Sequence, residues 1–248
     1  MSGLLQGIME KGINVDVIDE TCSLDNYKVV IAPMTYMLRK DFASKVDNFV
    51  KNGGTYLSTF WSGIVDDTDL CFLGGFPGPL SEVLGIWDEE IECLDDNENI
   101  IVKGAAPVFD EHKLYTGSLL CSVVHAKNAK ILATFKNDFI KNYPALTVNN
   151  YGNGKAYYVA SRMDENFIYT LIEELLNNAG VKSEVKSLPY GVSCHTRYND
   201  KHEYVFIENY SDNSVTVNLD NTYQNVLTND KCSGIQELKA YEYLILRK

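Results

Sequence analysis

The sequence has no long apolar run and no excess of positive charge. No stretch of about 18 apolar residues occurs, so no transmembrane helix is predicted. The opening residues, MSGLLQGIMEKGINVDV, lack the basic and the long apolar segments of a signal peptide. Lys and Arg number 22 against 34 Asp and Glu, and the formal net charge of −12 repels nucleic acid and anionic membranes. We therefore expect neither nucleic acid nor a membrane as a partner.

Paired cysteines and clustered histidines are also absent. The six cysteines form no CxxC pair, and the four histidines lie far apart without a HExxH-like pair. This spacing in a long chain is typical of buried free thiols in a reducing cytoplasm. We therefore expect a cytoplasmic protein without a bound metal or cofactor. The cysteines are Cys22, Cys71, Cys93, Cys121, Cys194 and Cys232.

The first part of the chain alternates helical and strand patterns. This order is typical of an α/β domain, with a mostly parallel sheet flanked by helices as in amidotransferase-like and flavodoxin-like folds. Such a domain usually begins with a strand, so we expect its first strand to lie before Met1. The predicted elements are a helix at 4–9, strands at 13–17 and 29–32, a helix at 42–50 capped by Asp41, and a strand at 55–60.

From Tyr190 on the chain has no helical period, and we expect the domain boundary at 181–189, after a helix that ends at Gly180. Before that residue, a strand at 131–135, a hairpin around NNYGNGK and a helix at 167–176 are predicted. After it, short strands separated by turn residues predict a small antiparallel β-sandwich. These strands are expected at 192–198, 204–209, 215–219 and 241–247. The expected domains are therefore 1–184 and 185–248.

The stretch at 60–86, FWSGIVDDTDLCFLGGFPGPLSEVLGI, is the strongest candidate for function. Ser62 and Cys71 lack the glycine frame of a nucleophile elbow. The three aspartates lack the further oxygen ligands of a calcium loop, and Gly74-Gly75 is no dinucleotide fingerprint. Aromatic residues on a loop shaped by proline and glycine favour an interface instead, although the same loop could simply cover its own core. The candidate residues are Trp61, Asp66, Asp67, Asp69, Phe72, Phe76, Pro77 and Leu80.

Glutamates 89, 90 and 92 are a second acidic group. Paired carboxylates can hydrolyse glycosides, but neighbours in sequence do not face each other. We expect a solvent-facing acidic segment. His112 and His125 have no neighbouring Asp or Ser frame, so structural roles are expected for them.

The run GGTYLSTFWSGIVDDTDLCFLGGFPGPLSEVLGIWDEEI resembles the middle part of glycoside hydrolase family 42 β-galactosidases. The segments NVDVID, YKVVIAPMTYML, YPALTVNNYGNGKAYYVASR and GVSCHTRYNDKHEYVFIENYS extend the resemblance over nearly the whole chain. The sequence departs from the family pattern at Asp67, where Glu is expected, and at Ser81, where a basic residue is usual.

The resemblance implies a layout and a role. Family members carry a catalytic TIM barrel with two glutamates, then an amidotransferase-like trimerisation domain, then a small β domain. This chain would hold only the last two parts, without catalytic residues of its own. The intact protein would be a homotrimer, and a β-galactoside substrate would bind only through the barrel that this chain lacks. The loop at 60–86 would then be an assembly surface that can lie near a neighbour's sugar site.

Two alternatives stay open at this stage. The chain could be a stand-alone amidotransferase-like enzyme or small-ligand binder, which a reactive thiol of low pKa would favour. It could also be a carbohydrate-binding module that stacks sugars on tyrosines of its C-terminal part. Those tyrosines are Tyr190, Tyr198, Tyr204, Tyr210 and Tyr223.

Overall fold

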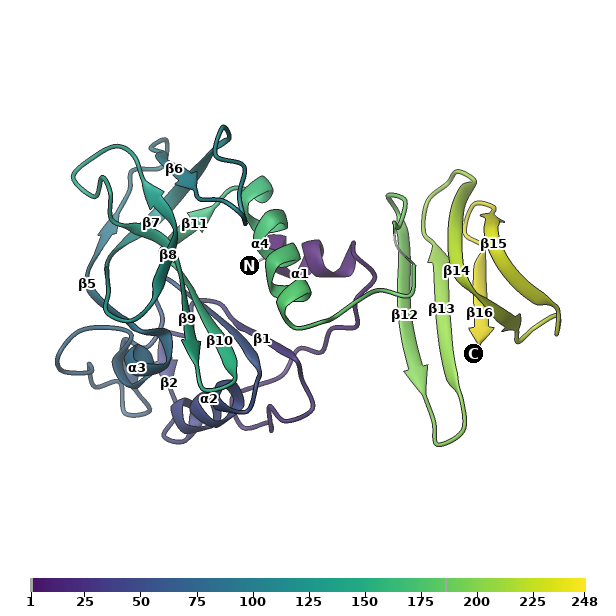
Figure 1. Cartoon of the computed structure of the whole chain (residues 1–248), viewed down its shortest axis with the longest axis horizontal. Helices are drawn as coiled ribbons and strands as arrows, with labels where there is room; N and C mark the ends of the chain where they lie inside the picture. Colours follow the sequence, from purple (N-terminus) through teal and green to yellow (C-terminus); the bar gives the residue numbers. More distant parts are fainter. Residues whose placement is uncertain (1, 186) are drawn as a thin grey trace. The chain divides into compact units, whose positions relative to one another are not determined.

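The computed structural model describes residues 2–185 and 187–248 (Figure 1). Contacts within the chain divide it into two compact units. We call Ile18–Gly180 the inserted unit, and Met1–Val17 together with Val181–Lys248 the terminal unit. The expected division after residue 184 placed the first 17 residues in the α/β domain, whereas their contacts group them with the C-terminal strands.

The inserted unit is built on a nine-stranded sheet of order β1-β3-β10-β9-β8-β6-β7-β11, with β5 paired to β7. Strands β3, β9 and β10 are almost wholly buried, as strands covered on both faces are, although their sequences include Thr, Ser, Asn and Lys. The strands are β1 (Val29–Ala32), β3 (Thr55–Thr59), β5 (Ile86–Cys93), β6 (Ile100–Gly104), β7 (Leu114–Ala126), β8 (Lys130–Phe135), β9 (Pro144–Tyr151), β10 (Gly154–Val159) and β11 (Ser161–Met163).

Parallel pairing in this sheet is confined to β1–β3 and β3–β10. The other pairs in the sheet are antiparallel, so the sheet is mixed, although the sequence led us to expect a mostly parallel one. The reason is that short turns join β8, β9 and β10, and a parallel pair needs a longer crossover. The α/β class and the flanking helices are confirmed.

Helices cover the inserted unit's sheet. Helix α2 (Phe42–Lys51) buries its predicted apolar face and packs with α3 (Ser81–Leu84) against β10. Asp41 does not cap α2 as expected, because its backbone is already helical and its side chain bonds no helix N–H. Helix α4 (Glu165–Asn178) is capped by Asp164, which accepts a hydrogen bond from the Phe167 N–H. A 3₁₀ turn, η1 (Gly78–Leu80), precedes α3.

The terminal unit combines helix α1 (Ser2–Met9) with a five-stranded antiparallel sheet of order β12-β13-β16-β14-β15. The antiparallel C-terminal unit is confirmed, and one apolar cluster draws residues from all five strands. The strand expected at 13–17 is wrong, since these residues form no strand. The strands are β12 (Val192–Tyr198), β13 (Glu203–Asn209), β14 (Val215–Asn225), β15 (Lys231–Leu238) and β16 (Tyr243–Arg247).

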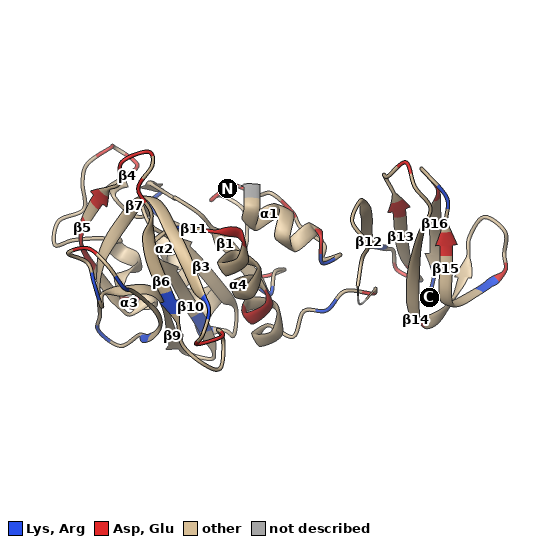
Figure 2. Ribbon diagram, turned by 90° about the horizontal axis from the view of Figure 1, so that it is seen from above, with Lys and Arg blue, Asp and Glu red and all other residues tan. Residues whose placement is uncertain are grey.

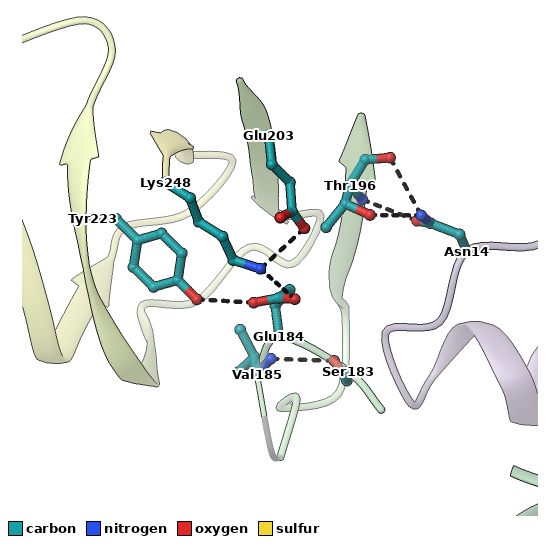
Figure 3. Close-up of polar contacts among 8 residues, drawn as sticks. All are labelled: Asn14, Ser183, Glu184, Val185, Thr196, Glu203, Tyr223 and Lys248. Atoms are coloured by element: carbon teal, nitrogen blue, oxygen red, sulfur yellow. Dashed lines mark hydrogen bonds and ion pairs between the residues drawn. The ribbon is translucent and has the colours of Figure 1, made fainter. Parts of the chain in front are cut away.

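Asn14 binds the outer edge of β12 instead of forming a strand (Figure 3). Its side-chain amide donates to the Thr196 hydroxyl at 2.6 Å and carbonyl at 3.3 Å, and its amide oxygen accepts from the Thr196 N–H at 2.9 Å. An edge strand leaves such backbone groups unpaired, so one side chain here takes the place of a neighbouring strand.

Glu184 ties the segment before β12 to the end of the chain (Figure 3). Its carboxylate accepts from the Tyr223 hydroxyl at 3.0 Å and from the Lys248 ammonium at 2.8 Å. Lys248 also reaches Glu203 at 3.0 Å, and these hydrogen bonds raise the pKa of Lys248 against the opposing effect of its burial.

Among the described residues, no helix is long and apolar enough to cross a membrane.

Candidate interaction surface

The loop at 60–80 is held against the loop at 33–38 by main-chain pairing. Strand β2 (Met37–Leu38) pairs in parallel with β4 (Val65–Asp66). The Gly63 N–H donates to the Thr35 carbonyl at 2.8 Å, and the Thr35 N–H donates to the Ser62 hydroxyl at 3.0 Å. Two loops that leave neighbouring strands β1 and β3 therefore form one rigid unit at the carboxyl ends of those strands.

Trp61 occupies the turn that directly follows β3. Its φ of +60° is rare for a residue with a side chain, and such strained turns persist only where surrounding contacts hold them. The indole is 36% exposed and stacks on the Tyr36 ring, with centroids 5.6 Å apart. Ser62, the nucleophile considered from sequence, is buried and its hydroxyl is occupied by Thr35. The turn therefore presents an aromatic surface where an elbow enzyme would present a nucleophile.

The three aspartates shape the tip of the loop. Asp66 accepts hydrogen bonds from the Thr68 hydroxyl and the N–H groups of Thr68 and Leu70. The Thr68 hydroxyl contributes most to lowering the pKa of Asp66, followed by the two N–H groups. Asp67 and Asp69 are exposed, and Asp69 has a φ of +63°. No group of three potential metal ligands occurs in the described part of the chain.

The remaining candidate residues support the loop from below. Leu80 and Pro77 are buried, while Phe72 and Phe76 are partly buried. Phe76 pairs its backbone with Asp88 through hydrogen bonds of 2.8 and 3.1 Å. A side chain at Gly78 would overlap the Phe72 ring at 2.5 Å. These residues therefore help to fix the shape of the loop, and contact of the partly exposed Phe72 and Phe76 with a partner stays a prediction.

Six of the exposed large apolar side chains lie on the two paired loops, while others are spread over the rest of the chain, and we call these six the assembly surface. Leu73 is 98% exposed and Leu70 is 67% exposed, which is unusual for leucine in a folded chain. The sequence singled out Trp61 but missed the three members from the first loop. Their only signal was the run APMTYML after a buried strand. The members are Met34, Tyr36, Met37, Trp61, Leu70 and Leu73.

The acidic segment after this loop, which contains Glu89, Glu90 and Glu92, forms strand β5 and is therefore part of the sheet. Glu89 and Glu90 are exposed as expected, and Glu89 lies 2.7 Å from His125 on β7. His125 also stacks on Trp87, so its structural role fits the expectation.

Cys71 and Cys93 are exposed, which corrects the expectation that all the thiols are buried.

Asp88 is a buried carboxyl that sequence reasoning missed. It is fully buried and accepts a hydrogen bond from the Tyr158 hydroxyl at 2.9 Å, which lies 3.2 Å from the Ser122 hydroxyl. Burial raises the pKa of Asp88 to about 6, against the opposing effect of the Ser122 and Tyr158 hydroxyls. Because its carboxyl is buried and bonded to the Tyr158 hydroxyl, we interpret Asp88 as part of the interior of the sheet below the loop.

Comparison with known protein families gives two matches that cover most of the chain. The model described as the beta-galactosidase trimerisation domain matches residues 5–182. The model described as the beta-galactosidase C-terminal domain matches residues 191–248.

Curated relatives and solved structures agree with these matches. The beta-galactosidase Pbg of Clostridium perfringens is 39% identical over 96% of this chain, and BgaA of a Planococcus species is 42% identical over 95%. The crystal structure of a beta-galactosidase from Bacillus circulans sp. alkalophilus superposes with a TM-score of 0.94 at 36% identity over 99% of this chain. The chain spans 35% of the length of both curated relatives and 36% of the crystallised one.

Proposed function

Because this chain belongs to the glycoside hydrolase family 42 β-galactosidases, as their trimerisation and C-terminal domains, we propose that it assembles as a homotrimer through the assembly surface. The observation that carries the proposal is the group of exposed apolar side chains on two paired loops. Apolar anchors on a preformed surface bind well, because little conformational freedom is lost on association.

A trimer explains why this surface is apolar in a chain that is otherwise strongly charged. Contiguous exposed apolar groups on a soluble protein mark interaction sites. In a closed three-fold ring each contact joins two different patches of neighbouring copies. The stacked Trp61 and Tyr36 and the fully exposed Leu73 are the natural anchors of one side of that contact.

The proposal also concerns how this chain would contribute to the hydrolysis of galactosides. The matched relatives are named β-galactosidases, and hydrolysis of β-galactosides would belong to the remaining two thirds of such proteins. The aspartates at the tip, Asp66, Asp67 and Asp69, would then face a neighbour's sugar site, where carboxylates can accept hydrogen bonds from hydroxyl groups. The chain itself would carry no catalytic residue. In this proposal residues 1–184 serve as the trimerisation domain and residues 185–248 as the C-terminal domain.

A cytoplasmic location is part of the same proposal. All six cysteines are free, and exposed thiols such as Cys71 and Cys93 persist in reducing compartments. The net charge of −12 also argues against nucleic acid and anionic membranes as partners.

The test is the solution mass of the chain and of a Trp61→Ser variant, measured by light scattering on a sizing column. We expect the native chain at three times the monomer mass and the variant at about the monomer mass. The matched control is Tyr198→Ser, which removes an exposed aromatic side chain from the terminal unit and should leave the trimer intact. A native monomer, or a trimeric Trp61→Ser variant, would overturn the proposal. Hydrolysis of a chromogenic galactoside by the pure chain would overturn its non-catalytic part.

A further inference from the structure

The inserted unit carries two shallow hollows that meet at Ile131. One has a volume of about 300 Å³ and includes His125 and Lys141, and the other has a volume of about 450 Å³ and includes Lys103 and Lys136. Ile131 is itself 40% exposed. The hollows therefore form one extended face with an apolar centre and lysines around it. We call Lys103, Ile131, Lys136 and Lys141 the lysine face.

These lysines have no anionic partner within the described residues. No ion pair joins them to a carboxylate in that part of the chain, and Glu111 is the acidic residue that lines the same hollows. Residues 99–143 contain 6 lysines against 3 acidic residues, in a chain whose net charge is −12. A positive face on a strongly acidic protein is suited to an anionic partner.

The acidic counterpart lies on the same unit. Residues 86–98 contain 7 acidic residues and no basic one. Figure 2 shows acidic residues along β5, which pairs with β7 in the sheet and, at Asp88, with the backbone of Phe76. Apart from Glu89, which contacts His125, we call the exposed or partly exposed acidic residues of this segment the acidic strand: Glu90, Glu92, Asp95, Asp96 and Glu98.

The acidic strand continues the assembly surface. The backbone of Phe76, at the base of the loop, pairs with Asp88 at the start of β5. Gly75 packs so closely on Trp87 that an added Cβ would lie 1.9 Å from the indole nitrogen. The apolar loop and the acidic strand therefore form one side of the inserted unit. An apolar centre with a lysine rim is its chemical complement.

We infer that the lysine face of one copy receives the acidic strand of the next copy in the trimer. This inference rests on the proposed function, because it names the second patch that a three-fold contact requires. Opposite charges would fix the register of the contact, while Ile131 and the loop's leucines would supply apolar area. The occupant is a second copy because the same chain carries both complementary patches.

The test reverses charges on each patch separately. The face variant is Lys136→Glu with Lys141→Glu, and the strand variant is Glu92→Lys with Asp95→Lys. Each variant places like charges opposite each other in every contact of the ring, so we expect the trimer's dissociation constant to rise about tenfold or more. The matched control is Lys201→Glu with Lys231→Glu, two exposed lysines of the terminal unit, which should leave the mass unchanged.

A chain that carries both sets of changes distinguishes a specific contact from general repulsion. Its acidic face would meet its own basic strand in the neighbour, so we expect the trimer to return. A mixture of the face variant and the strand variant should form pairs but no closed trimer, because favourable contacts cannot alternate around a ring of three. Native association should also weaken as salt rises from about 0.05 to 0.5 M.

The outcomes separate the inference from the proposed function. A native trimer that neither variant weakens, or folded doubly changed chains that stay monomeric, would overturn the inference and leave the trimer standing. A native monomer would overturn both. Circular dichroism and tryptophan fluorescence verify that each variant is folded. If a variant is unfolded, a native association that is insensitive to salt would still overturn the inference.

Discussion

The inserted and terminal units differ in how completely their buried polar groups are hydrogen-bonded. Six buried side-chain atoms have no hydrogen-bond partner among the described residues, and every one belongs to the inserted unit. In the terminal unit, the buried Asn209 donates to the carbonyls of Asn213 and Lys239 and accepts from Ser211. The six atoms are Glu20 Oε1, Tyr56 Oη, Ser58 Oγ, Trp87 Nε1, Asp88 Oδ1 and Thr147 Oγ1.

Size explains the difference. An unpaired buried polar atom costs about 1–3 kcal/mol, and a larger unit buries more apolar surface to offset that cost. The small terminal unit has one modest apolar cluster, so its buried polar side chains must be satisfied. The two units can be followed separately, since both tryptophans, Trp61 and Trp87, lie in the inserted unit.

The largest expected effect compares two glycines with nearly the same backbone. Gly63 has a φ of +64° and Gly234 a φ of +65°, but an added Cβ would lie 2.3 Å from the Pro77 carbonyl oxygen at Gly63 and would meet nothing within 4 Å at Gly234. We expect Gly63→Ala to lower the free energy of unfolding by about 4 kcal/mol and Gly234→Ala by about 1–2 kcal/mol. Urea unfolding followed by circular dichroism measures both. Equal losses of unfolding free energy in the two variants would show that the positive φ alone, and not the contact with Pro77, determines the cost of the added Cβ.

The next effect concerns the buried carboxyl of Asp88. Its pKa is about 6 in the folded chain against an ordinary value of 3.8, so the folded state binds the proton more tightly. The protonated carboxyl contributes its full stabilisation below about pH 4. This contribution is lost as the pH rises toward 6, and the total loss in the free energy of unfolding is about 3 kcal/mol. Asp88→Asn should therefore gain stability over the native chain between pH 4 and 7, as measured by tryptophan fluorescence in urea. Tyr158→Phe removes the donor and should lose stability at pH 7; a gain there would contradict this account.

The smallest effect compares two buried tyrosine hydroxyls. Tyr56 Oη has no partner, whereas Tyr223 donates to Glu184 at 3.0 Å. We expect Tyr56→Phe to change the free energy of unfolding by less than about 0.5 kcal/mol or to raise it, and Tyr223→Phe to lower it by about 1 kcal/mol. Tryptophan fluorescence follows the first variant and near-ultraviolet circular dichroism the second. Similar losses in both would show that the hydroxyl of Tyr56 is satisfied after all.

The terminal strands could be predicted because alternation and turn residues agree there. Strand β12 begins and ends at the predicted residues. In contrast, β7 was missed, although it is the longest strand, because LYTGSLLCSVVHA contains a glycine and changes from alternating to continuously buried positions. Periodicity alone does not identify a strand whose faces change their surroundings along its length.

Only part of the assembly surface could be predicted from the sequence. Trp61 stood out because aromatics, glycines and prolines are close together in sequence around it. Tyr36 and Met34 lie about 25 positions earlier and reach the same surface only because β1 and β3 are neighbours in the sheet. Asp88, directly before the acidic run at 89–92, was missed, since charge alone does not show which side chain of a strand faces the core.

The grouping of Met1–Val17 with Val181–Lys248 has a consequence for the order of synthesis. The ribosome synthesises the whole inserted unit before it makes Thr196, the residue that Asn14 binds on β12. The inserted unit can therefore fold while the first 17 residues wait without their partners. Completion of the terminal unit then joins segments 182 positions apart, so it should follow the folding of the inserted unit.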